Sequence, residues 1–278
     1  MIHLSNIKTA IVTGASSGIG RAIAIHLAQA GMHVYMTGRN EEKLELIRDQ
    51  IEKTGGRASI SAFDIRDIEK LQHFVQQAAQ QTGRLDVMVN NAGLHLHGEI
   101  AEADPDIWRE MIDVNIMALL AGSQAAIRAM RQHPDAAVGH IINISSGNAK
   151  EPGKDFYSAT KHMVNALCEA LTHELADEPI RVSNIMPGAV ATNFGRSVDP
   201  ARIQELACKL GIDVEIKKDE HLPDALLERI HAAMGQIFLS ADDIAKAVLY
   251  VLNQPQNVVV REVYLTAPDV YLGKEFSM

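Results

Sequence analysis

Two hydrophobic patterns alternate along most of the chain. Short apolar, β-branched runs such as residues 9–13 are typical of buried strands, and longer stretches with apolar residues three or four apart are typical of amphipathic helices. Further strands are expected at residues 33–37, 57–62, 85–90, 140–144, 180–186 and 258–265. Helices are expected after residue 20 and at 41–53, 68–81, 105–131, 156–176 and 241–252. This alternation predicts an α/β fold, with a doubly wound parallel sheet and helices on both faces.

Composition excludes several classes of protein. The chain has 278 residues, 47% of them hydrophobic, and a net charge of −9 without a long basic run, so a single domain over 1–278 is expected and nucleic acid is not. No apolar run reaches the ~18–20 residues of a membrane span. Residues 1–8 are too polar for a signal peptide, which favours the cytoplasm. The two cysteines and 12 histidines show no metal-ligand spacing, so no metal site is expected.

A glycine-rich turn separates the first expected strand from the helix after it. Glycines permit a tight turn and a close approach of backbone, and the first amides of the helix can hold a pyrophosphate. The first two glycines stand one residue farther apart than in the common dinucleotide fingerprint. A dinucleotide site is favoured over a plain turn. The residues expected to contact the dinucleotide here are Gly14, Ser16, Ser17, Gly18, Ile19 and Gly20.

Arg39 indicates which dinucleotide is bound. It follows the second expected strand, about twenty residues past the glycines, where an acidic residue would accept a hydrogen bond from the ribose 2′-hydroxyl. An arginine at this position pairs instead with a 2′-phosphate. NADP(H) is therefore predicted over NAD(H), and the alternative is an Arg39 that is merely exposed on a loop.

Tyr157 and Lys161 are the candidate acid–base pair. They stand four residues apart in an expected helix, so they lie on one face, one turn apart. An unperturbed phenol has a pKa near ~10, too high for proton exchange at neutral pH. Because a neighbouring ammonium lowers that pKa, the pair predicts a proton relay with Tyr157 as general acid or base.

These features occur in one order, together with Asn90-Asn91-Ala92-Gly93, a serine after the strand 140–144, and Pro187-Gly188. In that combination the sequence resembles the short-chain dehydrogenase/reductase family, of its shorter kind. The resemblance covers about residues 8–192 and, more loosely, 240–266. It implies a Rossmann fold and an NADP(H)-dependent oxidoreductase that interconverts a small-molecule carbonyl and an alcohol.

The resemblance also implies roles for individual residues. Tyr157 would be the general acid or base, and Lys161 would lower its pKa and bind the nicotinamide ribose. Ser146 would bind the substrate oxygen, and Asn115 would hold a water that links Lys161 to solvent. The other cofactor contacts that it implies are Asp64 near the adenine, Ile65, Asn91, Ala92, Gly93, Pro187, Gly188, Val190 and Thr192.

The catalytic serine has two candidates. Ser146 precedes Tyr157 by 11 residues and Ser145 by 12, both fewer than is common in the family. Alignment at the end of the strand favours Ser146, and because neighbouring strand residues face opposite ways, only one of the two is expected to serve.

Two expectations concern surfaces beyond the sheet. Apolar residues on more than one face of the 105–131 helix, with Met163 and Leu167 on the next helix, favour a homodimer or homotetramer, as the resemblance implies. Residues 193–239 interrupt the alternation and are expected to be a variable substrate loop that closes as a lid, with a fixed oligomer contact as the alternative. The alternative function is a non-catalytic dinucleotide sensor or scaffold.

Overall fold

The computed structural model describes residues 8–132, 139–150, 155–190, 192, 238–255 and 257–268. The strands are β1 (Thr9–Thr13), β2 (His33–Gly38), β3 (Arg57–Ala62), β4 (Val87–Asn90), β5 (Gly139–Ile144), β6 (Ile180–Pro187) and β7 (Glu262–Leu265). The α-helices are α1 (Gly18–Gln29), α2 (Glu41–Lys53), α3 (Ile68–Thr82), α4 (Pro105–Ile112), α5 (Ala118–Arg131), α6 (Phe156–Glu174) and α9 (Ala241–Leu252). A π-helical turn, η2 (Asp113–Met117), joins α4 to α5, and a 3₁₀ turn, η3 (Gly147–Ala149), follows β5.

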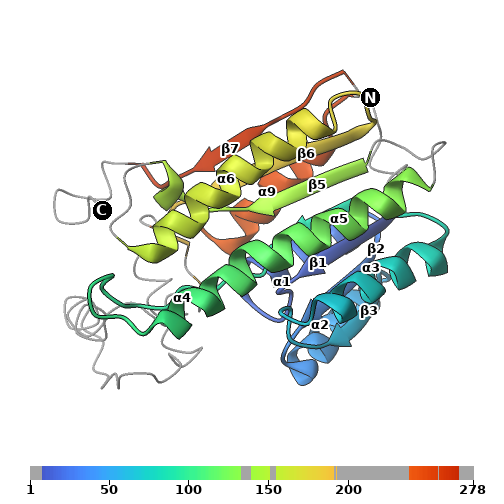
Figure 1. The fold of residues 1–278 in the computed structure, drawn as a ribbon. Helices are drawn as coiled ribbons and strands as arrows, with labels where there is room; N and C mark the ends of the chain where they lie inside the picture. The colour runs from blue at the N-terminus through green and yellow to red at the C-terminus, as the bar shows by residue number, and fades with distance from the viewer. Residues whose placement is uncertain are drawn as a thin grey trace.

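The strands form one parallel sheet in the order β3-β2-β1-β4-β5-β6-β7. The order reverses between β1 and β4, and at such a switch point the two diverging connections leave a crevice at the carboxyl ends of the strands. The predicted doubly wound, Rossmann-like α/β fold is confirmed (Figure 1).

Helices cover both faces of the sheet with separate apolar cores. On one face α1, α2 and α9 bury residues such as Ile23, Leu44 and Val248 against the sheet. On the other face α3, α5 and α6 bury residues such as Phe74 and Val164 against the sheet. Figure 1 looks onto this face. Because each central strand is buried on both sides, its run is continuously apolar rather than alternating, as the sequence shows for β1.

The last strand and the long helix differ from expectation. The strand expected at 258–265 begins only at Glu262, since Val258 closes a turn by donating its amide to the Pro255 carbonyl, and Val259 is exposed. The helix expected at 105–131 is interrupted by η2, a type of turn that often marks a functional position. No helix in the described part of the chain is long and apolar enough to cross a membrane.

Candidate active site

The glycine-rich turn after β1 is shaped by contacts that only glycine allows. Gly14 and Gly18 have φ angles of 64° and 54°, in the left-handed region. A Cβ atom on Gly14 would lie 2.9 Å from the Cα atom of Ala92. One on Gly20 would overlap the Gly14 carbonyl oxygen and the Asn91 side chain. The backbone is therefore bare at the start of α1, where Ser17 is the N-cap and the first amides have no helical acceptor.

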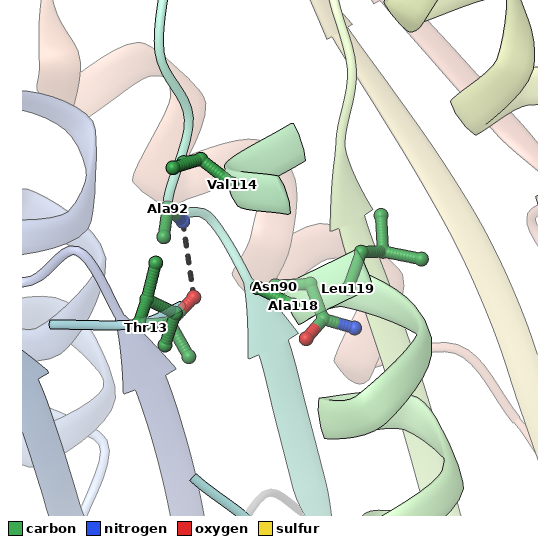
Figure 2. Close-up of a pocket in the computed structure, with 7 residues that line it drawn as sticks. Thr13, Asn90, Ala92, Val114, Ala118 and Leu119 are labelled. Atoms are coloured by element: carbon green, nitrogen blue, oxygen red, sulfur yellow. Dashed lines mark hydrogen bonds between the residues drawn. The ribbon is translucent and has the colours of Figure 1, made fainter. Parts of the chain in front are cut away.

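Asn91 and Thr13 join this turn to the end of β4. The side-chain nitrogen of Asn91, Nδ2, donates to the carbonyls of Thr13 (2.8 Å) and Gly14 (3.3 Å). The Thr13 hydroxyl accepts from the backbone amides of Asn91 and Ala92, both at 3.0 Å, the second drawn in Figure 2. The side chain of Asn91 thus binds the turn and fixes its position. Its expected place beside the cofactor stays a prediction.

A narrow crevice lies beside this junction, between the ends of β1 and β4 and the η2–α5 helix (Figure 2). Ala92 and Val114 line it close to each other. Ile65 lines it from the loop after β3. Its lining combines apolar side chains with the polar side chains of Thr13 and Asn90. Asn90 lies at its floor, where the side chain donates to Ser123 (2.9 Å).

Ser16 lies over the end of β2, next to the position of Arg39. A Cβ atom on Gly38 would lie 3.0 Å from the Ser16 hydroxyl oxygen, so this hydroxyl lies directly over the residue before Arg39. The Arg39 side chain is exposed and, within the described residues, makes no hydrogen bond or ion pair. Asp64, expected near the adenine, is held by Arg66 at 2.6 Å, and this hydrogen bond keeps the pKa of its carboxyl low.

Tyr157 is buried at the start of α6. Burial raises the pKa of its phenol, because the anion would lose its hydration. A hydrogen bond with Ser146 opposes that rise, while the negative charge of Asp155 adds to it. In this structure burial outweighs the opposing hydrogen bond with Ser146. The lowering of this pKa by Lys161 stays a prediction.

Lys161 is fully enclosed one turn after Tyr157. Its ammonium donates to the Ile144 carbonyl at 3.0 Å and lies 5.7 Å from the centre of the Tyr157 ring. Burial lowers the pKa of this ammonium to about 8, because the charged form is deprived of water. The hydrogen bond anchors the amine at the end of β5, on the same helix face as Tyr157.

The two candidate serines face opposite sides of the chain. Ser145 is buried behind β5 and donates to Asn165 at 2.8 Å and to the Lys161 carbonyl at 3.3 Å. Ser146 is partly exposed, accepts from the Asn148 amide at 3.2 Å and is hydrogen-bonded to Tyr157. Ser146 is thus the serine beside the phenol, as alignment at the strand end predicted.

Asn115 lies in the π-helical turn and is buried. Its side chain accepts from the Leu94 amide (2.7 Å) and donates to the Leu94 carbonyl (2.9 Å) and to the Thr160 hydroxyl (3.0 Å). Thr160 in turn donates to the Tyr157 carbonyl at 2.7 Å. Asn115 therefore ties the loop after β4 to the helix that carries Tyr157.

The segment after β6 borders the glycine-rich turn. The Gly188 amide donates to the Leu265 carbonyl at 2.7 Å, and a Cβ atom on Gly18 would lie 3.3 Å from Thr192. Val190 pairs with Leu239 in an isolated parallel bridge, so the two ends of the long insertion lie side by side at the site. The lid expected at 193–239 lies outside the described residues, except for its last two positions.

Two residues at this site were not singled out from the sequence as catalytic candidates. His95, in the loop after β4, stacks on the Tyr157 ring, and Asp155 caps the start of α6. An Asp at the start of a helix is a readable capping signal, but nothing in the pattern showed that His95 would reach the tyrosine.

The glycine-rich turn, the adjacent crevice and the buried Tyr157–Lys161 pair thus lie at one edge of a Rossmann-like sheet. The sequence profile of the short chain dehydrogenase family matches residues 8–203, and the chain belongs to this family. An uncharacterized oxidoreductase of Staphylococcus aureus is 34% identical over 258 residues, which cover 92% of this chain and 95% of the relative. A second uncharacterized oxidoreductase, from Staphylococcus saprophyticus, is 34% identical over 266 residues, which cover 95% of this chain and 98% of the relative.

Solved structures give the same assignment. An alcohol dehydrogenase from Thermococcus sibiricus, complexed with 5-hydroxy-NADP, is 26% identical with a TM-score of 0.74, covering 94% of this chain and 97% of its own. A short chain dehydrogenase from Burkholderia cenocepacia, in complex with NADP, is 26% identical with a TM-score of 0.75, covering 95% and 98%.

Proposed function

We propose that this protein is an NADP(H)-dependent oxidoreductase that interconverts a carbonyl and a primary or secondary alcohol, with Tyr157 as general acid or base. The observation that carries the proposal is the contact of Tyr157 with Ser146 at the sheet edge that also holds the glycine-rich turn. The two hydroxyls give one substrate oxygen two donors, beside a bare backbone suited to phosphate.

The residues at the β1–β2 end fit a dinucleotide. Gly14, Gly18 and Gly20 keep the turn free of side chains at these positions, and a Cβ atom at Gly14 or Gly20 would meet neighbouring backbone. Ser16 and Arg39 offer a hydroxyl and a guanidinium to a 2′-phosphate. The bound NADP in the two structural relatives supports NADP(H) over NAD(H).

The nicotinamide would supply or accept the hydride. The residues of this chain transfer the proton. As a carbonyl is reduced, negative charge develops on its oxygen. Tyr157 donates its proton to that oxygen, and Ser146 donates a hydrogen bond to it. In alcohol oxidation Tyr157 takes the proton back. The pKa of Lys161 is about 8, so at neutral pH its ammonium places a positive charge 5.7 Å from the centre of the Tyr157 ring.

The replacement Tyr157→Phe tests the proposal. It removes the transferable proton and little volume, so turnover should fall by the ~10²–10⁴-fold typical of lost acid–base catalysis, while NADPH still binds. The assay follows NADPH oxidation with a panel of aldehydes, ketones and keto acids, and NADPH fluorescence gives the affinity. Near-parental turnover in Tyr157→Phe would show that another group moves the proton.

Two further variants sharpen this test. Tyr250→Phe is the matched control, because Tyr250 lies on α9 with 57% of its surface exposed, and it should keep full turnover. Ser146→Ala should lower turnover without loss of NADPH affinity, since it removes the donor beside the phenol. If the parent binds NADPH but reduces no member of the panel, a non-catalytic sensor becomes the better reading.

We also propose a homodimer or homotetramer. Met117, on η2, and Met163, on α6, are 46% and 43% exposed, and these neighbouring elements present apolar surface away from the sheet. Covering it against a second copy would remove that surface from water. Light scattering at micromolar concentration checks the proposal, and a monomeric mass would refute it.

A further inference from the structure

The face of the Tyr157 ring is covered by a histidine. His95 comes from the loop after β4, and its ring centre lies 4.3 Å from that of Tyr157, with the two planes at 21°. This is a close stacked contact, just shorter than the roughly 4.5–7 Å common for aromatic pairs. The side chain of His95 is only 17% exposed, so the contact is enclosed and not a surface encounter.

Asp155 holds this histidine, and the two oxygens of its carboxylate have separate tasks. Oδ1 caps α6 by accepting from the Ser158 amide at 2.8 Å and from the Ser158 hydroxyl at 2.7 Å. Oδ2 lies 3.2 Å from Nε2 of His95. Because the cap fixes the carboxylate relative to α6, and α6 carries Tyr157, the imidazole is held in register with the phenol it covers.

The charges around the two rings act in opposite directions. Burial lowers the pKa of His95, and Lys161 and His97 lower it further, while Asp155 raises it. The same Asp155 raises the pKa of Tyr157. The titratable groups that face the pair thus come from both elements packed on it: His97 from the loop, Asp155 and Lys161 from α6.

We propose that His95, held by Asp155, is a positioning residue that fixes the plane of the Tyr157 ring. The inference rests on the proposed role of Tyr157. The loop after β4 and the start of α6 then act as one unit, since Asn115 binds the same loop at Leu94 and the same helix at Thr160. A consequence is that Asp155 contributes to the pH at which Tyr157 exchanges its proton.

The replacement Asp155→Asn separates the charge from the cap. Asparagine is as good an N-cap as aspartate, so α6 keeps its start. Removal of the negative charge makes the phenol easier to ionise. In alcohol oxidation the phenolate is the active base, so kcat/KM, which rises with pH, should reach its midpoint about 0.5 pH unit lower or more. The substrate is the alcohol of the panel that the parent oxidises fastest.

Two replacements of His95 test the stacking. His95→Ala removes the ring and the tether, and a misplaced phenol should lower turnover about tenfold or more. His95→Phe keeps a ring on Tyr157 without the tether to Asp155, so it should recover part of that loss. NADPH affinity, measured by fluorescence, should match the parent in both variants, because His95 is not part of the glycine-rich turn.

A second His–Asp pair provides the matched control. His26 on α1 lies 3.0 Å from Asp242 on α9, on the opposite face of the sheet. His26→Phe and Asp242→Asn should leave both turnover and the pH midpoint unchanged. These two variants measure the effect of losing a His–Asp pair that does not contact Tyr157.

A readout without turnover separates this inference from the proposed function. NMR titration of the His95 ring, assigned by its loss in His95→Phe, should show a lower pKa for His95 in Asp155→Asn. Parental turnover in His95→Ala, or an unshifted pH midpoint in a folded Asp155→Asn, would overturn the inference. Parental turnover in Tyr157→Phe would overturn the proposed function instead, whatever the His95 variants show.

Discussion

The two halves of the candidate site are built by different physics. The β1–β4 half, around Gly14 and Gly20, is a backbone surface whose shape depends on missing side chains. The β5–α6 half is a set of buried ionisable side chains, in which burial shifts the pKa of Tyr157 upward and that of Lys161 downward. One half is therefore limited by sterics and the other by desolvation.

The difference teaches where each half is fragile. An added methyl group damages the first half, because the nearest atoms are backbone and cannot turn aside. The second half also responds to changes of charge, since a buried ammonium or phenolate has lost its water. Replacements of single residues can therefore damage binding in one half and alter proton exchange or stability in the other.

The largest effect on binding is expected from Gly20→Ala. Its Cβ atom would overlap the Gly14 carbonyl, and overpacking costs about 1–3 kcal/mol. Expressed in affinity, that is roughly ten- to a hundredfold weaker binding of NADPH by fluorescence titration. Gly55→Ala is the control: Gly55 has a φ of 82° and open space around it, so that variant should lose stability but keep its affinity. Parental affinity in Gly20→Ala would contradict a steric cradle.

A smaller effect is expected at the end of β2. If Arg39 pairs with a 2′-phosphate, the parent should prefer NADPH over NADH by at least about tenfold in kcat/KM, or about 1.4 kcal/mol. Arg39→Asp should abolish or reverse that preference, because a carboxylate repels the phosphate and accepts from a ribose hydroxyl. Equal efficiency with both cofactors in the parent would refute this assignment. Arg57 is exposed at the start of β3, at the sheet edge away from Arg39, so the charge reversal Arg57→Asp should leave the preference unchanged.

The smallest effect is on stability, at Lys161. The pKa of Lys161 is lowered to about 8 in the folded chain from 10.5 for the free side chain. The unfolded chain therefore binds more protons between these values, so stability rises with pH across that window, and the full cost of burial is present below pH 8. Lys161→Met removes this cost while it disables the site.

Thermal unfolding measures that cost. Lys161→Met should melt above the parent at pH 7, by roughly 2–4 °C for each kcal/mol recovered, and the gap should narrow at pH 9.5. Lys53→Met, at an exposed position on α2, should show no such pH-dependent gap. A variant that melts below the parent at pH 7 would mean that the hydrogen bond to Ile144 outweighs desolvation.

Several features of the site could be read from the sequence because they are local. Strand, turn and helix at β1–α1 follow from an apolar run, glycines and a helical period, and the Tyr157–Lys161 pair follows from helix spacing. Alignment at the strand end favoured Ser146 over Ser145, and Ser146 is the one hydrogen-bonded to Tyr157. Parallel strands then bring such loops to one edge wherever they occur in the chain.

What the tertiary structure alone decided are the contacts between distant segments and the burial that results from them. Asn91 binds the turn at Gly14, 77 positions away, and His95 meets Asp155 across 60 positions. Neither partner carries a local signal of the other. Burial likewise belongs to the packed molecule: the same Tyr–Lys spacing on an open helix would leave both groups hydrated. The sequence alone thus determined which chemical groups reach the sheet edge, and packing determined which of them touch and how readily they exchange protons, because desolvation depends on every neighbour at once.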